Sequence, residues 1–205
     1  MEERVTFISG GYEINGLVEK FDMRKGAVIT HPHPLYGGDM HNSVVVAITR
    51  AYQKHGYTTL RFNFRGVGGS QGSYADGSGE QEDVRAAVSC LAEMGIQQID
   101  VAGYSFGAWV NAHLDCSDGC IANMLMVSPP LAFIGFETVS TINCLRLIVT
   151  GSRDDIAPVE LIKQSYPGWN PSARFEVIKG ADHFYGGYTE KLEALLSSYL
   201  ATTEG

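Results

Sequence analysis

Short apolar runs alternate along the chain with longer segments in which apolar residues recur every three or four positions. The short runs predict strands, and the longer period predicts amphipathic helices. The predicted strands cover residues 5–9, 15–21, 26–30, 58–64, 98–102, 123–127, 145–150 and 174–178. This alternation predicts an α/β fold, in which about eight strands form a mostly parallel sheet with helices on both faces.

Glycines lie at the ends of several of these predicted elements. Gly56 and Gly95 each follow a helical segment and are typical of the left-handed residue that ends a helix. The predicted helices cover residues 43–55, 79–94, 105–114 and 189–200. The first two strands are joined by a short, glycine-containing connection, so we expect them to form an antiparallel hairpin.

The composition favours one domain spanning residues 1–205, because a chain of this length buries about 70% of its unfolded surface in a single core. The net charge of −8 argues against a nucleic-acid partner. No apolar window reaches the length of about eighteen residues that a bilayer-spanning helix needs, so no membrane partner is expected. The first residues enter the first strand without an apolar signal segment, and a soluble, cytoplasmic protein is therefore expected.

The four cysteines, Cys90, Cys116, Cys120 and Cys144, are expected to be reduced thiols, because a domain with a core of this size does not need disulfides. Cys116 and Cys120 are four residues apart, which is a possible metal-ligand spacing. No histidine or further cysteine nearby completes a set of four ligands. Packing is therefore the favoured role of the cysteines, and no metal site is predicted from them.

Candidate chemistry appears first at Gly103-Tyr104-Ser105-Phe106-Gly107, directly after a short apolar run. A strand that turns at once into a helix forces the residue at the turn to positive φ, and flanking glycines relieve the crowding. Such a turn lifts the serine hydroxyl above the sheet edge and aims the next backbone N–H at the place where negative charge develops. Ser105 is therefore the candidate nucleophile, and the N–H of Phe106 is a candidate oxyanion donor.

A serine nucleophile needs a base, and the base needs an acid that orients it. His183, in the loop after the last predicted strand, is the only histidine beyond the serine's helix and is the candidate base. The preceding strand opens into a loop with two adjacent carboxylates, Asp154 and Asp155. Asp154 is preferred because its spacing from the flanking glycine and proline is typical of the acid loop of serine hydrolases, and Asp155 is the alternative. Asp182 is expected to stabilise its own loop, since the side chains of neighbouring residues diverge.

Together these features resemble the α/β-hydrolase superfamily, and more narrowly a group of small bacterial hydrolases related to dienelactone hydrolase. The segments that carry the resemblance are His31-Pro32-His33-Pro34-Leu35-Tyr36-Gly37-Gly38, Arg61-Phe62-Asn63-Phe64-Arg65-Gly66 with Gly69-Ser70 and Gly72, the serine turn, the acid loop and Asp182-His183-Phe184. The chain order serine, acid, histidine also matches the superfamily. Dienelactone hydrolase looks to have a cysteine nucleophile where this chain has Ser105, so its substrate is not carried over. The resemblance implies an α/β-hydrolase fold, and the short connection 128–143 leaves no room for a cap or lid domain.

The second oxyanion donor of this fold comes from the loop after the third strand. Pro32 and Pro34 have no N–H, so Leu35 and His33 remain. Leu35 is preferred because it follows a His-Pro pair, as the donor follows His-Gly in many relatives. The alternative that His31, His33 and His41 bind a metal lacks a set of carboxylate ligands.

The expected function is therefore that of a serine hydrolase that cleaves carboxylic esters or thioesters of small or exposed acyl groups, with a small molecule as its partner. The candidates for an apolar acyl wall are Tyr36, Tyr104, Leu131, Phe133, Ile134 and Phe136. For each of them, packing on the sheet is the alternative. A peptidase or amidase with the same triad and a non-catalytic binding protein are the alternatives. No cofactor is expected, because Gly66-Val67-Gly68-Gly69 lacks the full dinucleotide-binding spacing. A monomer or homodimer is expected.

Overall fold

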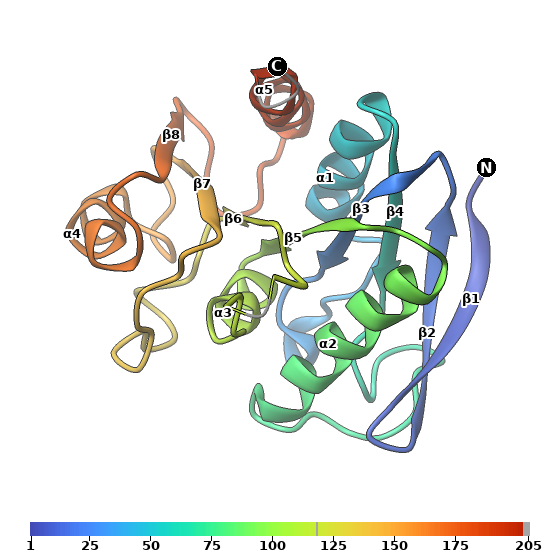
Figure 1. Ribbon diagram of the computed structural model, residues 1–205. Helices are drawn as coiled ribbons and strands as arrows, with labels where there is room; N and C mark the ends of the chain where they lie inside the picture. Colours follow the sequence, from blue (N-terminus) through green and yellow to red (C-terminus); the bar gives the residue numbers. More distant parts are fainter. Residues whose placement is uncertain (118, 203–205) are drawn as a thin grey trace.

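The computed structural model of the protein describes residues 1–117 and 119–202. Within these residues, eight strands form one sheet in the order β1-β2-β4-β3-β5-β6-β7-β8 (Figure 1). The strands are β1 (Glu3–Ser9), β2 (Tyr12–Glu19), β3 (Asp22–Thr30), β4 (Tyr57–Phe62), β5 (Gln98–Tyr104), β6 (Asn123–Val127), β7 (Leu145–Gly151) and β8 (Arg174–Ile178). β2 pairs antiparallel with β1 and with β4, and the other neighbours are parallel. The predicted mostly parallel sheet is confirmed.

The hairpin of β1 and β2 has a two-residue turn. Ser9 lies opposite Tyr12, and between them Gly10 and Gly11 have φ of +55° and +88°. A tight hairpin turn whose twist matches that of the strands needs positive φ at both central residues, which glycine adopts most easily. The predicted antiparallel hairpin is confirmed, and β2 begins three residues earlier than predicted.

Helices cover both faces of the sheet, as predicted. The helices α1 (Ser43–Lys54) and α5 (Thr189–Thr202) lie on one face, and α2 (Ser78–Glu93), α3 (Phe106–Ala112) and α4 (Val159–Trp169) lie on the other (Figure 1). The sequence pattern did not predict α4. This helix buries only Ile162 and Trp169 and has Pro167 in its last turn, so its apolar stripe is weak and ends at a helix breaker.

The central strands separate two apolar cores. In β5, Val101 packs with α2 and α3, whereas the next residue, Ala102, packs with α1 and α5. In β6, Met126 belongs to the core on the side of α2 and α3, and Leu125 belongs to the core on the side of α1 and α5. Because both faces of these strands are buried, apolar residues occupy consecutive positions at Val101 and Ala102 in β5 and at 124–127 in β6 instead of alternating with polar residues.

The connection from β6 to β7 is short and contains no helix or strand between residues 128 and 144, all of which the structure describes. The fold therefore has no cap or lid domain at the position where one was considered. Cys144, at the end of this connection, forms a disulfide with Cys116, and their Cα atoms are 6.0 Å apart. The expectation of four reduced thiols is thus wrong for this pair. The two cysteines are 28 residues apart in the sequence, and the sheet brings the segment after α3 next to the start of β7.

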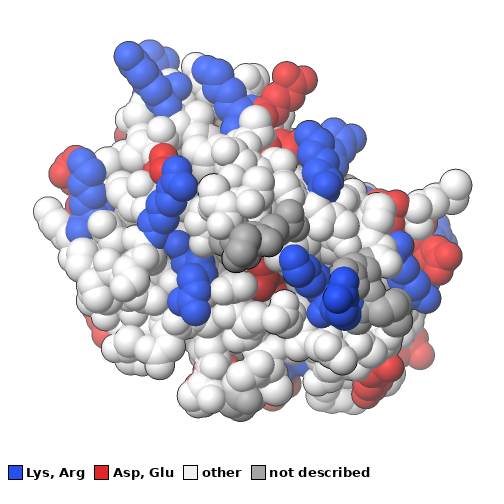
Figure 2. All heavy atoms as spheres, turned by 45° about the horizontal axis from the view of Figure 1, so that its top comes forward, with Lys and Arg blue, Asp and Glu red and all other residues white. Residues whose placement is uncertain are grey.

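The charged side chains are dispersed over the surface in view. On the face shown in Figure 2, Lys and Arg side chains are spread out instead of gathering in one patch. Of the helices in the described residues, none is both long and apolar enough to cross a membrane.

Candidate active site

Ser105 lies at a sharp turn between β5 and α3. Its φ is +53°, so the predicted positive φ is confirmed. The chain passes too close to itself here for larger residues, because a Cβ on Gly103 would be 2.5 Å from the carbonyl carbon of Gly107. A Cβ on Gly107 would be 2.6 Å from Thr30 Oγ1. The two glycines therefore allow close packing of α3 against β3 and β5, and this packing holds the serine in its strained conformation.

The three candidate catalytic side chains lie within hydrogen-bonding distance of one another. Ser105 Oγ is 2.9 Å from His183 Nε2. His183 Nδ1 is 3.0 Å from each carboxylate oxygen of Asp154. All three residues are buried, with 7%, 6% and 4% of Ser105, His183 and Asp154 exposed. The structure thus brings together, from three separate loops, the three residues that the sequence nominated.

Backbone donors hold the carboxylate of Asp154. Its Oδ1 accepts hydrogen bonds from the N–H of Ile156 at 3.0 Å and of Ala157 at 2.7 Å. Burial alone would raise the pKa of Asp154, but the hydrogen bond and charge of His183, together with the Ala157 N–H and the Ser128 hydroxyl, lower it below its ordinary value. Asp154 is therefore a charged acceptor at neutral pH.

The other two candidate carboxylates lie elsewhere. Asp155 is exposed. Asp182 is also exposed, and its Oδ1 accepts a hydrogen bond from the Phe184 N–H at 3.1 Å, so it stabilises its own loop. Only Asp154 of the three contacts the ring of His183.

Tyr104 has a role that the sequence analysis missed. Its hydroxyl donates a hydrogen bond of 2.8 Å to the carbonyl of His183, and its ring lies 5.5 Å from the His183 ring. Sequence reasoning placed Tyr104 only in the acyl wall. The sequence did contain one indication of this role. Tyr104 directly precedes Ser105 and is the last residue of the strand that leads to the nucleophile.

His31 stabilises the loop after β3. Its Nε2 accepts a hydrogen bond of 3.0 Å from the Phe64 N–H, and its Nδ1 lies 2.6 Å from the carbonyl of Pro32. Burial lowers the pKa of His31 to about 4, so the ring is neutral at pH 7. Both nitrogens are occupied by protein contacts, which does not fit a metal ligand. Across residues 1–117 and 119–202, no group of three or more His, Cys, Asp or Glu side chains could hold a metal ion.

The two candidate oxyanion donors of this loop differ in their availability. The Leu35 N–H donates a hydrogen bond of 3.2 Å to His33 Nδ1, as part of the cap of a short 3-10 helix (Pro34–Tyr36). The Leu35 side chain is 67% exposed and does not line the pocket at Ser105, whereas His33 does. Within the described residues, the N–H groups of His33 and Phe106 donate to no protein acceptor.

A pocket of about 360 Å³ opens beside Ser105 and His183. Four of the predicted wall residues line it, namely Tyr36, Tyr104, Phe133 and Ile134. Phe136 does not, because it is buried and stacks on Trp169 with ring centroids 5.2 Å apart. Leu131 also lies outside the pocket and packs against the core. The pocket lining contains no Asp, Glu, Lys or Arg side chain.

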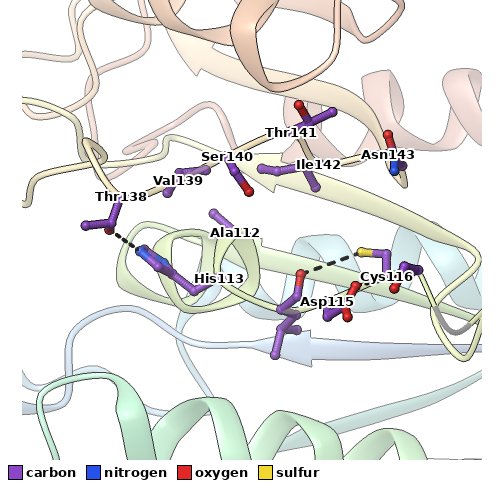
Figure 3. Close-up of a pocket in the computed structure, with 12 residues that line it drawn as sticks. Ala112, His113, Asp115, Cys116, Thr138, Val139, Ser140, Thr141, Ile142 and Asn143 are labelled. Atoms are coloured by element: carbon purple, nitrogen blue, oxygen red, sulfur yellow. Dashed lines mark hydrogen bonds between the residues drawn. The ribbon is translucent and has the colours of Figure 1, made fainter.

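A second cavity, of about 240 Å³, lies between the end of α3 and the residues before β7 (Figure 3). His113 borders it and points toward Thr138 (Figure 3). Both nitrogens of this ring have protein partners, with Nε2 3.1 Å from Thr138 Oγ1 and Nδ1 2.8 Å from the Trp109 carbonyl. The cavity therefore presents no histidine with a free ring nitrogen, and it lacks the arrangement of nucleophile, base and acid found at Ser105.

Known proteins are similar to this chain in sequence and in fold. The chain is 35% identical over 188 residues to an uncharacterized protein of Rickettsia prowazekii (strain Madrid E), covering 87% of this chain and 79% of that protein. It is 33% identical to an α/β serine hydrolase homologue of Coxiella burnetii, with a TM-score of 0.88 and 97% of each chain covered. It is 26% identical to an α/β serine hydrolase without a lid from Xanthomonas campestris, with a TM-score of 0.86 and 96% of this chain and 92% of that chain covered.

No protein-family model matches the chain. The narrower relation to dienelactone hydrolase stays a prediction. Sequence identity, nearly complete coverage and the shared lidless fold lead to one assignment. The chain belongs to the α/β-hydrolase superfamily, among the small α/β serine hydrolase homologues.

Proposed function

We propose that the protein is a carboxylesterase-like serine hydrolase that cleaves esters or thioesters of small, uncharged, apolar acyl groups through an acyl-enzyme. The observation that carries this proposal is the continuous contact from Ser105 Oγ to His183 Nε2 and from His183 Nδ1 to Asp154. A charged carboxylate only accepts hydrogen bonds, so Nδ1 carries the proton and Nε2 is free to act as a base.

In the first step, Ser105 Oγ attacks the acyl carbonyl carbon, and its proton passes to His183 Nε2. Asp154 stabilises the positive charge that forms on the ring. The N–H groups of Phe106 and His33 are the proposed donors to the oxyanion, His33 replacing Leu35 because the Leu35 N–H is already used. The bond to the leaving oxygen or sulfur then breaks, and His183 returns the proton to the leaving group.

In the second step, water attacks the acyl carbon. His183 takes a proton from the water, and the bond to Ser105 Oγ breaks as the proton is delivered to that oxygen. The products are a carboxylic acid and the free enzyme. Every step uses only side chains, backbone N–H groups and water.

The proposed acyl class follows from the pocket. A charged acyl group would lose its hydration beside Phe133, Ile134 and Phe106 without meeting an opposite charge, because the lining has no Asp, Glu, Lys or Arg side chain. Burial also lowers the pKa of His33, the second histidine of the lining, which favours its neutral form. The rings of Tyr36 and Phe133 lie 5.7 Å apart and approach from two different loops, so they form an aromatic edge to the pocket. Apolar and aromatic acyl groups fit such a surface.

A panel of p-nitrophenyl esters tests the proposed function. The acetate, butyrate and benzoate esters should be hydrolysed at least about tenfold faster, by kcat/KM, than the hemisuccinate, whose acyl group carries a negative charge. Ser105→Ala should lower each rate by on the order of 10⁴ or more. Equal rates for the wild type and Ser105→Ala would contradict the proposal. Faster cleavage of aminoacyl p-nitroanilides would instead favour a peptidase or amidase.

The acyl wall has a matched control. Phe133 lines the pocket and is 55% exposed, whereas Phe21 is 49% exposed and does not line it. Phe133→Ala should raise the KM for the butyrate ester several-fold because it removes apolar contact with the acyl chain. Phe21→Ala should leave KM unchanged. The same KM in both variants would contradict the proposal that Phe133 contacts the acyl chain.

A further inference from the structure

Non-glycine residues with positive φ are concentrated at this site. Among the described residues they are Asp76, Ser105, Ser128 and Tyr185. Ser128 directly follows β6, and Tyr185 lies two residues after His183. Such conformations cost free energy and persist only where surrounding contacts favour them. The strained backbone of Ser128 and Tyr185 therefore needs an explanation separate from that of the nucleophile Ser105.

The side chains of Ser128 and Tyr185 meet. Ser128 Oγ is 2.9 Å from the Tyr185 hydroxyl, and both residues are fully buried. The Ser128 N–H also donates to the Val149 carbonyl at 2.7 Å, which fixes its backbone to β7, the strand that leads to Asp154. The pair thus connects the histidine loop to the end of the sheet beside the acid.

The backbone of Tyr185 belongs to the same loop as His183. Its N–H donates to the Asp182 carbonyl at 3.3 Å, and its carbonyl accepts a hydrogen bond of 2.9 Å from the Tyr188 N–H. Burial raises the pKa of Tyr185 far above its ordinary value, so its hydroxyl stays protonated and can donate to Ser128 Oγ. A displacement of the loop that carries His183 would therefore break the contact with Ser128.

We propose that Tyr185 and Ser128 form a positioning pair, in which the hydrogen bond between their hydroxyls joins the loop of His183 to the end of β6, so that the His183 ring stays aligned with its partners in the triad. The inference rests on the proposed function and adds two residues to the machinery of that site. Neither residue lines the substrate pocket. The pair therefore acts on the rate of the chemical step and not on substrate binding.

The strained backbone supports this role. Glycine would adopt positive φ without strain at either position, but it has no hydroxyl. Tyr185 is further held by an edge contact with Tyr104, whose ring centroid is 6.4 Å away. Tyr104 in turn donates to the His183 carbonyl. The histidine loop is thus held by one tyrosine hydroxyl on each side of the catalytic ring.

Tyr185→Phe and Ser128→Ala test the pair. Tyr185→Phe keeps the ring and removes one hydroxyl, and we expect kcat on p-nitrophenyl butyrate to fall about tenfold with KM unchanged. Ser128→Ala removes the other hydroxyl of the same hydrogen bond and should lower kcat by a similar factor. If the two residues act as one pair, the double variant should be no slower than either single variant.

Tyr52→Phe is the matched control, because Tyr52 is also fully buried and its hydroxyl lies 3.4 Å from Asp100, away from the triad residues. Its kcat should stay at the wild-type value even if its melting temperature falls. The proposed positioning role would be refuted by a wild-type kcat in Tyr185→Phe or by an equal loss of kcat in Tyr52→Phe. Independent, additive losses in the double variant would also refute it.

A readout without turnover separates this inference from the proposed function. The His183 Nδ1 proton, bonded to Asp154, should give a downfield proton resonance in the wild type. We expect it to shift or broaden in Ser128→Ala and Tyr185→Phe but not in Tyr52→Phe. An unchanged resonance in the first two variants overturns the pair. Failure of the wild type to hydrolyse any ester, with the resonance responding as expected, would refute the proposed function alone.

Discussion

At the scale of single residues, two carboxylates that are neighbours in the sequence have opposite environments. Asp154 is buried and contacts His183 Nδ1 through both oxygens, whereas Asp155 is exposed. Sequence spacing favoured Asp154, but it gave no physical reason why its neighbour was excluded. The reason is the turn closed by the Ile156 and Ala157 N–H groups, which aims only the first carboxylate at the base.

Asp154→Asn should lower kcat by about 10³ to 10⁴, because an amide no longer stabilises the positive ring and favours the wrong tautomer of His183. Asp155→Asn changes the same functional group one residue away and should leave kcat within about twofold. Ester hydrolysis under saturating substrate measures both. A large loss in Asp155→Asn, or none in Asp154→Asn, would reverse the assignment.

Asp100 is a buried carboxylate remote from the triad, and it sets a pH dependence of stability. Its oxygens accept hydrogen bonds from Asn123 at 2.9 Å and Tyr52 at 3.4 Å. Burial raises the pKa of Asp100 from 3.8 to about 6. Between these values the folded protein holds a proton that the unfolded chain has released, so this group lowers the stability as pH rises through the window.

Asp100→Asn removes that buried charge. The free energy of unfolding at pH 8 should therefore increase by up to about 3 kcal/mol. His31 has the opposite effect on the pH dependence of stability. Its pKa is lowered from 6.5 to about 4, so as pH falls below 6.5 the unfolded chain takes up a proton before the folded protein does, and stability falls. The variant should therefore lose stability between pH 6.5 and 4 more steeply than the wild type. Urea unfolding at pH 4, 6 and 8 measures this, and parallel curves for the two proteins would contradict it.

The proposed oxyanion donors show a limit of prediction from single residues. Pro32 and Pro34 are excluded as donors from the sequence alone, because they have no N–H. The preference for Leu35 over His33 did not take account of a side-chain cap, in which His33 Nδ1 accepts the Leu35 N–H. Such a local contact follows from the rotamer of one ring, which the sequence pattern does not specify.

At the scale of elements, the turn between β5 and α3 was the most predictable feature. Glycine spacing after an apolar run predicted a strand, a strained serine and a helix in that order, and each of these is present. The helix is shorter than predicted, because it ends at Ala112 instead of residue 114. Elements with a weak apolar stripe were not predictable in this way. In α4, exposure of most residues and a proline in the last turn removed the helical signal.

Gly103→Ala should disrupt this turn, because the new Cβ would meet the Gly107 carbonyl carbon at 2.5 Å. We expect a loss of about 1–3 kcal/mol in the free energy of unfolding and a fall in kcat of about 10² from displacement of the serine. Gly168→Ala is the control, since a Cβ there meets nothing within 4 Å in α4. That change should stabilise the protein by about 0.5–1 kcal/mol. A Gly103→Ala variant with wild-type melting temperature and kcat would contradict this account of the turn.

At the scale of the whole molecule, the site depends on strand order. Ser105, Asp154 and His183 follow β5, β7 and β8, which lie on one side of the sheet and run parallel, so their carboxyl ends meet at one edge. The period of apolar residues predicted the strands but not their order. The resemblance to a known superfamily predicted the fold as a whole, and the order of the strands comes from the structure. Neither the apolar pattern nor the resemblance predicted the disulfide between Cys116 and Cys144.

The absence of a cap or lid in the β6–β7 connection has a kinetic consequence. Tyr36 and Phe184 at the pocket are 72% and 69% exposed, so a substrate reaches Ser105 without a loop having to open. Hydrolysis of tributyrin should therefore rise smoothly with concentration and show no jump where emulsion droplets form. A sharp increase in rate at the solubility limit would indicate interfacial opening and contradict this description.

We propose above all that Ser105 is a nucleophile activated by His183 and Asp154. Treatment with a fluorophosphonate, followed by intact-mass measurement, tests this most directly because the reagent reports the activated serine without requiring the natural substrate. We expect one adduct on the wild-type protein, none on Ser105→Ala and much slower labelling of Asp154→Asn. No adduct on the folded wild type, or the same adduct on Ser105→Ala, would contradict it.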